Sequence, residues 1–90
     1  MPKFVIEREV PGASQMSPAQ LKEASQASNG VIVNLAPDIQ WVQSFVTDDK
    51  IYCVYIASDE QKIKEHAQQA GLPANKISKV SVTIDPSTGE

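Results

Sequence analysis

The only histidine of the chain, His66, is the side chain best suited to ligate a metal or to move a proton near neutral pH. It lies shortly before Gly71 and Pro73, which form a strong helix stop because glycine adopts the left-handed conformation and proline cannot continue the helix. His66 therefore belongs to the last turn of a predicted helix. Two roles fit that position: the imidazole interacts with the negative end of the helix, or it is a ligand of a metal or substrate site.

Other side chains could form a binding site together with His66. A cleft between the predicted sheet and helices could be lined by aromatic and thiol groups, namely Trp41, Tyr52, Cys53 and Tyr55. The alternative is that these side chains belong to the core and to a dimer interface. The sequence contains no Gly-rich phosphate loop, paired cysteine motif, nucleophile elbow or HExxH motif, so no standard catalytic constellation is predicted.

The composition limits the partners. Ninety residues, 41% hydrophobic and 21% charged, suffice for one globular domain. The net charge of -3, with eight scattered lysines and arginines, argues against nucleic acid. No apolar run approaches the ~20 residues of a spanning helix, so we expect a cytoplasmic protein with no membrane partner. The single Cys53 excludes an internal disulfide.

Two segments near the ends of the chain predict strands. Residues 3–9 are rich in β-formers and alternate Phe4 and Ile6 with residues of the other face. Residues 79–85 predict a strand with one buried face, formed by Val80, Val82 and Ile84. Residues 86–90 form a polar tail, so the predicted domain spans residues 1–85.

A long helix follows the first strand. Ser17 can cap it and form a capping box with Gln20, and apolar residues at helical spacing extend it to about Leu35. The pair Asn29-Gly30 leaves an alternative open, because a turn there would release residues 31–33 as a short strand.

The second predicted helix begins at a capping box formed by residues 58–61, with Ser58 as the N-cap. It carries Ile63 and Ala67 on one apolar stripe and ends at Gly71. His66 lies at the edge of that stripe.

The middle of the chain predicts a hairpin of two strands, residues 39–46 and 51–56, joined at Asp48-Asp49. Alternation in the first strand puts Ile39, Trp41 and Phe45 on one face and Val42 and Val46 on the other. Both strands are apolar on both faces. Helices can cover one face, and we expect a second copy of the chain to cover the other.

The resulting order is strand, helix, strand, strand, helix, strand. This order predicts an α+β fold, the ferredoxin-like βαββαβ sandwich, in which a four-stranded antiparallel sheet carries two helices on one face. Pairing of two such sheets through their open faces would give a homodimer of the dimeric α/β-barrel type.

Five stretches of the chain resemble a family of short bacterial proteins catalogued as a domain of unknown function, DUF4242, with a nickel-binding branch. These stretches are Pro2–Arg8, Gln40–Val42, Phe45–Cys53, Glu65–Ala67 and Gly71–Ala74. The resemblance covers nearly the whole chain. It implies a dimeric ferredoxin-like fold and surface binding of nickel for sequestration.

The residues supply few ligands for nickel, which prefers imidazole and accepts carboxylate and thiolate. Glu65 belongs with His66 to the stretch that resembles the family, yet adjacent helix residues project about 100° apart. Lys62 would lie near His66 and repel a cation. A tight site would therefore take ligands from another element or subunit, with these donors as candidates: Glu7, Glu9, Asp48, Asp49 and Cys53.

Three hypotheses follow. The first is a small homodimeric, non-catalytic nickel-binding protein with His66 as the principal ligand. The second, by fold-level analogy, is a cofactor-free enzyme of the dimeric α/β-barrel type that resembles a monooxygenase or an isomerase and acts on a small organic molecule. A closed apolar pocket containing Tyr55 and His66 would favour this enzyme. The third is a purely structural or regulatory interaction module.

Overall fold

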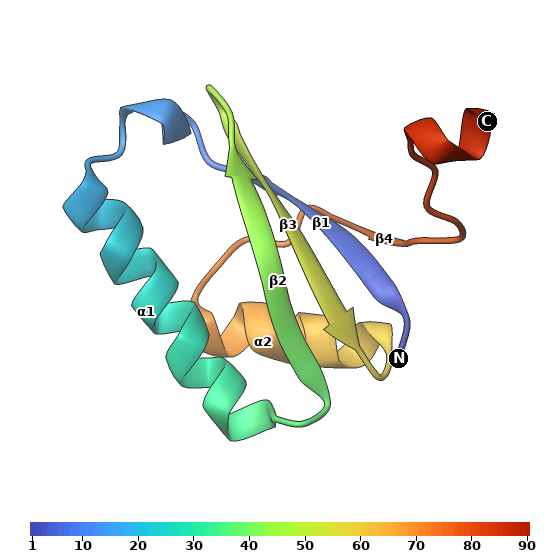
Figure 1. Cartoon of the computed structure of the whole chain (residues 1–90). Coiled ribbons are helices and arrows are strands. Elements are labelled where there is room, and N and C mark those ends of the chain that lie inside the picture. The colour runs from blue at the N-terminus through green and yellow to red at the C-terminus, as the bar shows by residue number, and fades with distance from the viewer.

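The strands and helices of residues 1–90 of the computed structural model follow the predicted order of strand, helix, strand, strand, helix, strand (Figure 1). The strands are β1 (Lys3–Glu9), β2 (Ile39–Val46), β3 (Lys50–Ala57) and β4 (Lys76–Lys79), and the helices are α1 (Pro18–Leu35) and α2 (Glu60–Ala70). Short 3-10 turns follow β1 (Ala13–Gln15) and β4 (Pro86–Gly89). All strand pairs are antiparallel and the spatial order is β2-β3-β1-β4, which confirms the predicted ferredoxin-like fold.

Both helices pack against one face of the sheet. The core on that face joins Phe4 and Ile6 of β1 to Ile63 of α2, and side chains of α1 pack at its edge. The opposite face carries side chains such as Val5 and Val54, which are partly exposed in the chain. Neither helix combines the length and the hydrophobicity of a bilayer-spanning segment.

Helix α1 begins and ends as the sequence predicts. The Ser17 hydroxyl accepts a hydrogen bond from the Gln20 backbone N–H, and the Gln20 side chain accepts one from Ser17 N–H. Gly30 is helical, and an added Cβ there would meet nothing within 4 Å. The alternative with a short strand at residues 31–33 is therefore wrong, because the helix tolerates one solvent-facing glycine at a cost of about 1 kcal/mol.

A β-bulge in β2 changes which side chains share a face. Trp41 pairs with Tyr55 and the next paired residue, Gln43, lies opposite Val54, so Val42 is an extra residue. Because side chains alternate along a strand, one inserted residue reverses the faces of everything after it. The predicted grouping of Phe45 with Trp41 is wrong: Trp41, Ser44 and Val46 face α1, and Phe45 lies opposite Tyr52 on the open face.

Helix α2 begins one residue later than the sequence predicts. Its N-cap is Asp59, whose carboxylate accepts a hydrogen bond from Lys62 N–H at 3.0 Å. Ser58 as the N-cap is wrong; its backbone N–H instead donates to the Asp38 carbonyl. The predicted stop is confirmed, since Gly71 adopts the left-handed conformation with φ of 69°.

The last strand is shorter and earlier than predicted. β4 pairs with β1 from Lys76 to Lys79, and the final backbone contact is Val80 N–H to the Lys3 carbonyl. β1 begins at Lys3, so the chain beyond this point has no strand to pair with. The predicted strand over residues 79–85 is therefore wrong, and so is the burial of its apolar face: Val82 is 76% and Ile84 74% exposed. We call residues 80–85 the C-terminal arm; Figure 1 shows it leading away from the sheet.

Candidate functional site

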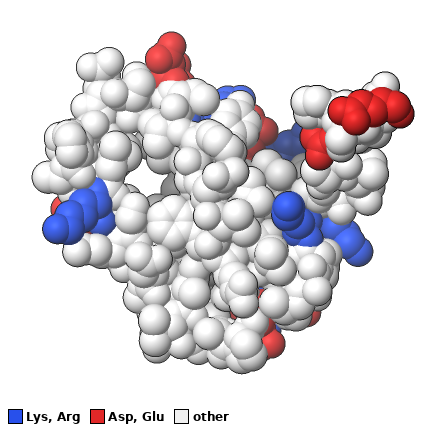
Figure 2. Space-filling view, in the orientation of Figure 1, with Lys and Arg blue, Asp and Glu red and all other residues white.

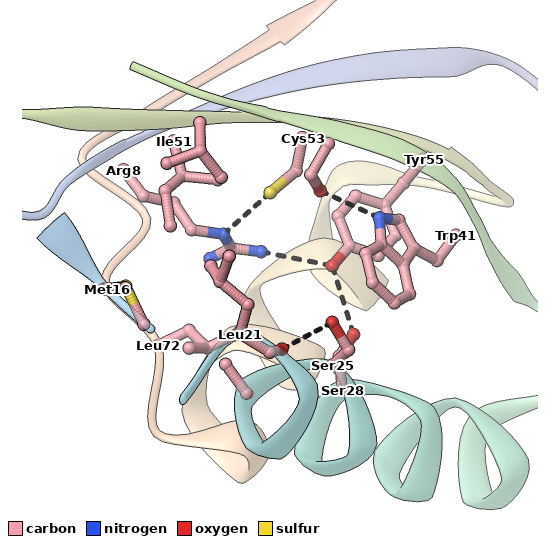
Figure 3. A pocket seen from close by; sticks show the side chains of 13 residues that line it. Arg8, Met16, Leu21, Ser25, Ser28, Trp41, Ile51, Cys53, Tyr55 and Leu72 are labelled. Atoms are coloured by element: carbon pink, nitrogen blue, oxygen red, sulfur yellow. Dashed lines mark hydrogen bonds between the residues drawn. The ribbon is translucent and has the colours of Figure 1, made fainter. Parts of the chain in front are cut away.

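A pocket lies between α1 and the sheet, with an empty volume of about 480 Å³ that includes space open to solvent. Figure 2 shows a hollow between α1 and β2, and Figure 3 shows the residues that line the pocket. Nine of the 13 lining residues are hydrophobic, and Arg8 is the only charged one. The pocket therefore combines apolar walls with a single cation.

Arg8 reaches the pocket because of its place on β1. Strand alternation points Phe4, Ile6 and Arg8 to the helix side, and the Arg8 side chain is only 2% exposed. Its Nε donates to Cys53 Sγ at 3.3 Å, and Nη1 donates to the Pro73 carbonyl at 2.6 Å. Nη2 donates to the Tyr55 hydroxyl at 3.4 Å (Figure 3). The guanidinium is thus fixed by three groups that carry no formal negative charge.

No carboxylate neutralises Arg8. The ion pairs of the chain join lysines to acids on the surface, and none includes Arg8. Burying a cation costs several kcal/mol unless an opposite charge or strong dipoles compensate it. Arg8 therefore leaves the floor of the pocket electropositive.

A chain of hydroxyl contacts connects the pocket floor to α2. The Tyr55 hydroxyl lies 3.4 Å from Ser28 Oγ, and Ser28 Oγ lies 2.9 Å from His66 Nε2. Because the guanidinium can only donate, Tyr55 accepts from Arg8 and its own proton is directed to Ser28. The direction of the hydrogen bond between Ser28 Oγ and His66 Nε2 depends on the tautomer of His66: Ser28 donates if Nδ1 carries the proton and accepts if Nε2 carries it. Burial raises the pKa of Tyr55, so its hydroxyl keeps this proton near neutral pH.

His66 is fully enclosed between the two helices and the sheet. It is 0% exposed, and its ring centroid lies 5.0 Å from that of Tyr55. Nδ1 has no hydrogen-bond partner, so the ring does not bond to the carbonyl end of α2. Burial, and after it the positive charge of Arg8, lowers the pKa of His66 below 6.5. The histidine is therefore a neutral, buried link between α1 and α2.

The acidic candidates for a metal site lie apart from His66. Glu65 is at the surface, where it pairs with Lys62 at 3.4 Å. Glu7 pairs with Lys50 across the open face of the sheet, and Asp49 accepts a hydrogen bond from Gly12 N–H beside the hairpin. No three residues of the types His, Cys, Asp and Glu cluster so as to hold a metal ion. The donors of a single chain do not fit a nickel site.

The pocket contains three of the four side chains predicted for a cleft. Trp41, Cys53 and Tyr55 line it, whereas Tyr52 lies on the other side of β3, opposite Phe45. His66 lies behind Ser28 and Tyr55 and does not line the pocket.

Sequence reasoning missed the two polar residues that organise the pocket, Arg8 and Ser28. The sequence could have indicated Arg8, because it follows Phe4 and Ile6 at alternate positions of β1 and therefore lies on the same face of the strand. Ser28 falls on the predicted apolar stripe of α1, where a serine signals a buried hydroxyl that needs a partner.

These features define a small α+β protein of ferredoxin-like fold with a pocket between helix and sheet, an enclosed neutral histidine and an unpaired buried arginine. The chain belongs to the family described as "Nickel responsive protein SCO4226-like", whose model matches residues 4–80. This family assignment agrees with the nickel-related family that the sequence resembles.

Among solved structures the chain is similar to the one described as "Crystal structure analysis of SCO4226 from Streptomyces coelicolor A3(2)". The TM-score is 0.77 with 20% sequence identity over 91% of this chain and 99% of that chain. At this identity the likeness shows the fold alone. No curated protein matches the chain.

Proposed function

We propose that the protein is a homodimer that binds or sequesters nickel without catalytic turnover. The observation that carries this proposal is the match of residues 4–80 to a family described as nickel responsive. That description names a response to a metal and no reaction, which favours a binding role over an enzymatic one.

Two exposed apolar surfaces support the homodimer. The open face of the sheet carries Phe45, which is 53% exposed, beside partly exposed side chains of β3. The C-terminal arm presents Val82 and Ile84 with no strand beside them. Apolar surface of this kind is characteristic of an interaction site. A second copy would cover the open face and offer the arm a strand to pair with.

Dimerisation would also affect how a nickel site could form. Because the donors of one chain do not converge, a nickel site of useful affinity needs ligands from two copies. Glu65 is available at the surface, whereas His66 could ligate only through Nδ1, since Nε2 is engaged by Ser28. Exposing Nδ1 requires the helices to move apart.

Calorimetric titration of tag-free protein with a nickel salt tests the proposal, alongside light scattering at micromolar concentration. We expect saturable nickel binding and a particle of twice the 9.8 kDa chain mass. A monomer, or the absence of saturable binding, would contradict the corresponding part of the proposal.

The His66→Ala variant decides between two ligand sets. If His66 is the principal ligand, its loss should weaken nickel binding by about tenfold or more, because carboxylates alone hold nickel loosely. Glu65→Gln is the matched surface variant. Equal affinity in His66→Ala and the parent would remove His66 from the site and leave its role as a link between the helices.

A further inference from the structure

We propose that the pocket between α1 and the sheet binds a small organic carboxylate, with the carboxylate against Arg8 and an apolar body beneath α1. This inference does not depend on nickel binding or on the dimer. It rests on a buried cation without an acidic partner, which lies at the floor of a pocket with apolar walls.

The guanidinium has hydrogen-bonding capacity left for a ligand. It donates three hydrogen bonds, one each from Nε, Nη1 and Nη2, and both Nη atoms carry a further N–H. Arginine presents such donors in a planar fork that matches a carboxylate. An anion bound there would supply the negative charge that Arg8 lacks in the chain.

The pocket changes from polar at its floor to apolar at its opening. Cys53, Ser28 and Tyr55 at the floor are buried, whereas Val46 near the opening is 42% exposed. Figure 3 shows Leu21 on the α1 side of the guanidinium. A ligand with one charged end and one apolar end fits this gradient, whereas an inorganic anion would leave the apolar walls unoccupied.

The size and charge of the pocket restrict the class of ligand further. The empty space of about 480 Å³ includes space open to solvent, so the enclosed part of the pocket admits only a small ligand. Arg8 is the only charged residue in the lining, so a monoanion balances the pocket and a more highly charged ligand does not. The indole of Trp41, held by a 2.9 Å hydrogen bond from Nε1 to Ser44 Oγ, offers an aromatic wall. The class we infer is an aromatic or branched monocarboxylate.

The first experiment compares phenylacetate with the neutral phenylacetamide. Trp41 is the only tryptophan of the chain and lines the pocket, so its fluorescence reports binding directly. We expect saturable binding of phenylacetate that is about tenfold tighter than that of the amide, because a hydrogen bond to a charged partner is stronger than one to a neutral partner. Equal affinities, or a signal that does not saturate, would overturn the proposal.

Variants then locate the binding. Arg8→Met should abolish the preference for the carboxylate, and a preserved preference contradicts the assignment. If this variant does not fold, Ala24→Phe, which fills the pocket from α1, should abolish binding of both probes. Ala27→Phe is the matched control, because Ala27 is exposed on the same helix and should leave binding unchanged. Unchanged phenylacetate binding in Ala24→Phe would place the ligand elsewhere and refute the proposal.

Discussion

The two faces of the sheet differ in how much of their apolar surface a single chain covers. On the helix side, alternating residues of β1 and β3 meet α1 and α2, and Phe4, Ile6 and Ile63 are almost fully buried. On the other side, Phe45 remains exposed and the C-terminal arm has no partner. The helix side contains the core and one buried charge without an ion-pair partner, and the open side is a partly exposed apolar surface. Stability and association should therefore depend on different residues.

The sharpest test of this difference uses two neighbours on β1. Ile6 is 0% exposed on the helix side, so Ile6→Ala should lower the free energy of unfolding by ~2–5 kcal/mol. Val5 points to the open face, and Val5→Ala should cost about 1 kcal/mol or less in the monomer. Urea unfolding at several protein concentrations measures both. Equal losses at every concentration would show that one chain covers both faces equally.

The C-terminal arm provides the second test. Replacing Val82 and Ile84 together by serine should raise the dissociation constant of the proposed dimer by at least about 100-fold, because each buried apolar side chain contributes ~1.5–3 kcal/mol. Sedimentation across a dilution series measures it. Val33→Ser is the matched control: Val33 is 76% exposed on α1 and should leave association unchanged. If the arm variant dimerises like the parent, the arm does not belong to the interface.

Most of the fold could be predicted because its signals are local. The Ser17 capping box, the Gly71 stop and the alternation of Phe4 and Ile6 in β1 each depend on a few neighbouring residues, and all three are confirmed. Together they determine the order of elements, and the order restricts the topology.

The remaining features depend on contacts between distant segments. The bulge at Val42 shows only when β2 is paired with β3, and the end of β4 is set by where β1 begins, at Lys3. In the candidate site, some residues were predictable from local sequence and others depend on contacts between distant segments. Trp41 and Tyr55 were predicted correctly and Tyr52 was not, whereas the role of Arg8 depends on Pro73, distant in sequence, and on the absence of an ion pair with any acid. A lone arginine in a strand does not reveal this by sequence alone.

The pH dependence of stability separates the enclosed histidine from surface groups. Burial and Arg8 lower the pKa of His66 in the folded state below the ordinary 6.5, while its other polar neighbours, Tyr55 and Ser28, remain neutral. Below 6.5 the unfolded chain therefore binds a proton that the folded chain excludes. Stability is fully present above 6.5 and falls as the pH drops from there toward the lower folded-state pKa, with a slope of at most about 1.4 kcal/mol per pH unit.

Chemical unfolding at a series of pH values from about 7.5 to about 5 measures this slope. The His66→Gln variant should lose most of the slope, because no other side chain of the chain has an ordinary pKa in this range. A slope that is unchanged in the variant would mean that other groups carry it.

Two glycines should respond to alanine with opposite signs. Gly71 has φ of 69°, so Gly71→Ala should destabilise the protein by about 1 kcal/mol. Gly30 is helical with open space around it, so Gly30→Ala should stabilise the protein by up to about 1 kcal/mol. Thermal unfolding of the pair measures both shifts. A stabilising Gly71→Ala would mean that α2 does not end in the left-handed turn.

The smallest expected effect concerns the first residues of α2, where sequence and structure disagree by one position. Asp59 caps the helix through its carboxylate, so Asp59→Ala should cost about 1 kcal/mol, as Ser17→Ala should at the start of α1. Ser58→Ala should change the free energy of unfolding by no more than about 0.5 kcal/mol, because its side chain makes no capping hydrogen bond and its backbone N–H keeps its bond to the Asp38 carbonyl. Urea unfolding of the three variants at neutral pH distinguishes the two caps. A larger loss in Ser58→Ala than in Asp59→Ala would restore Ser58 as the N-cap and shift the start of α2 back by one residue.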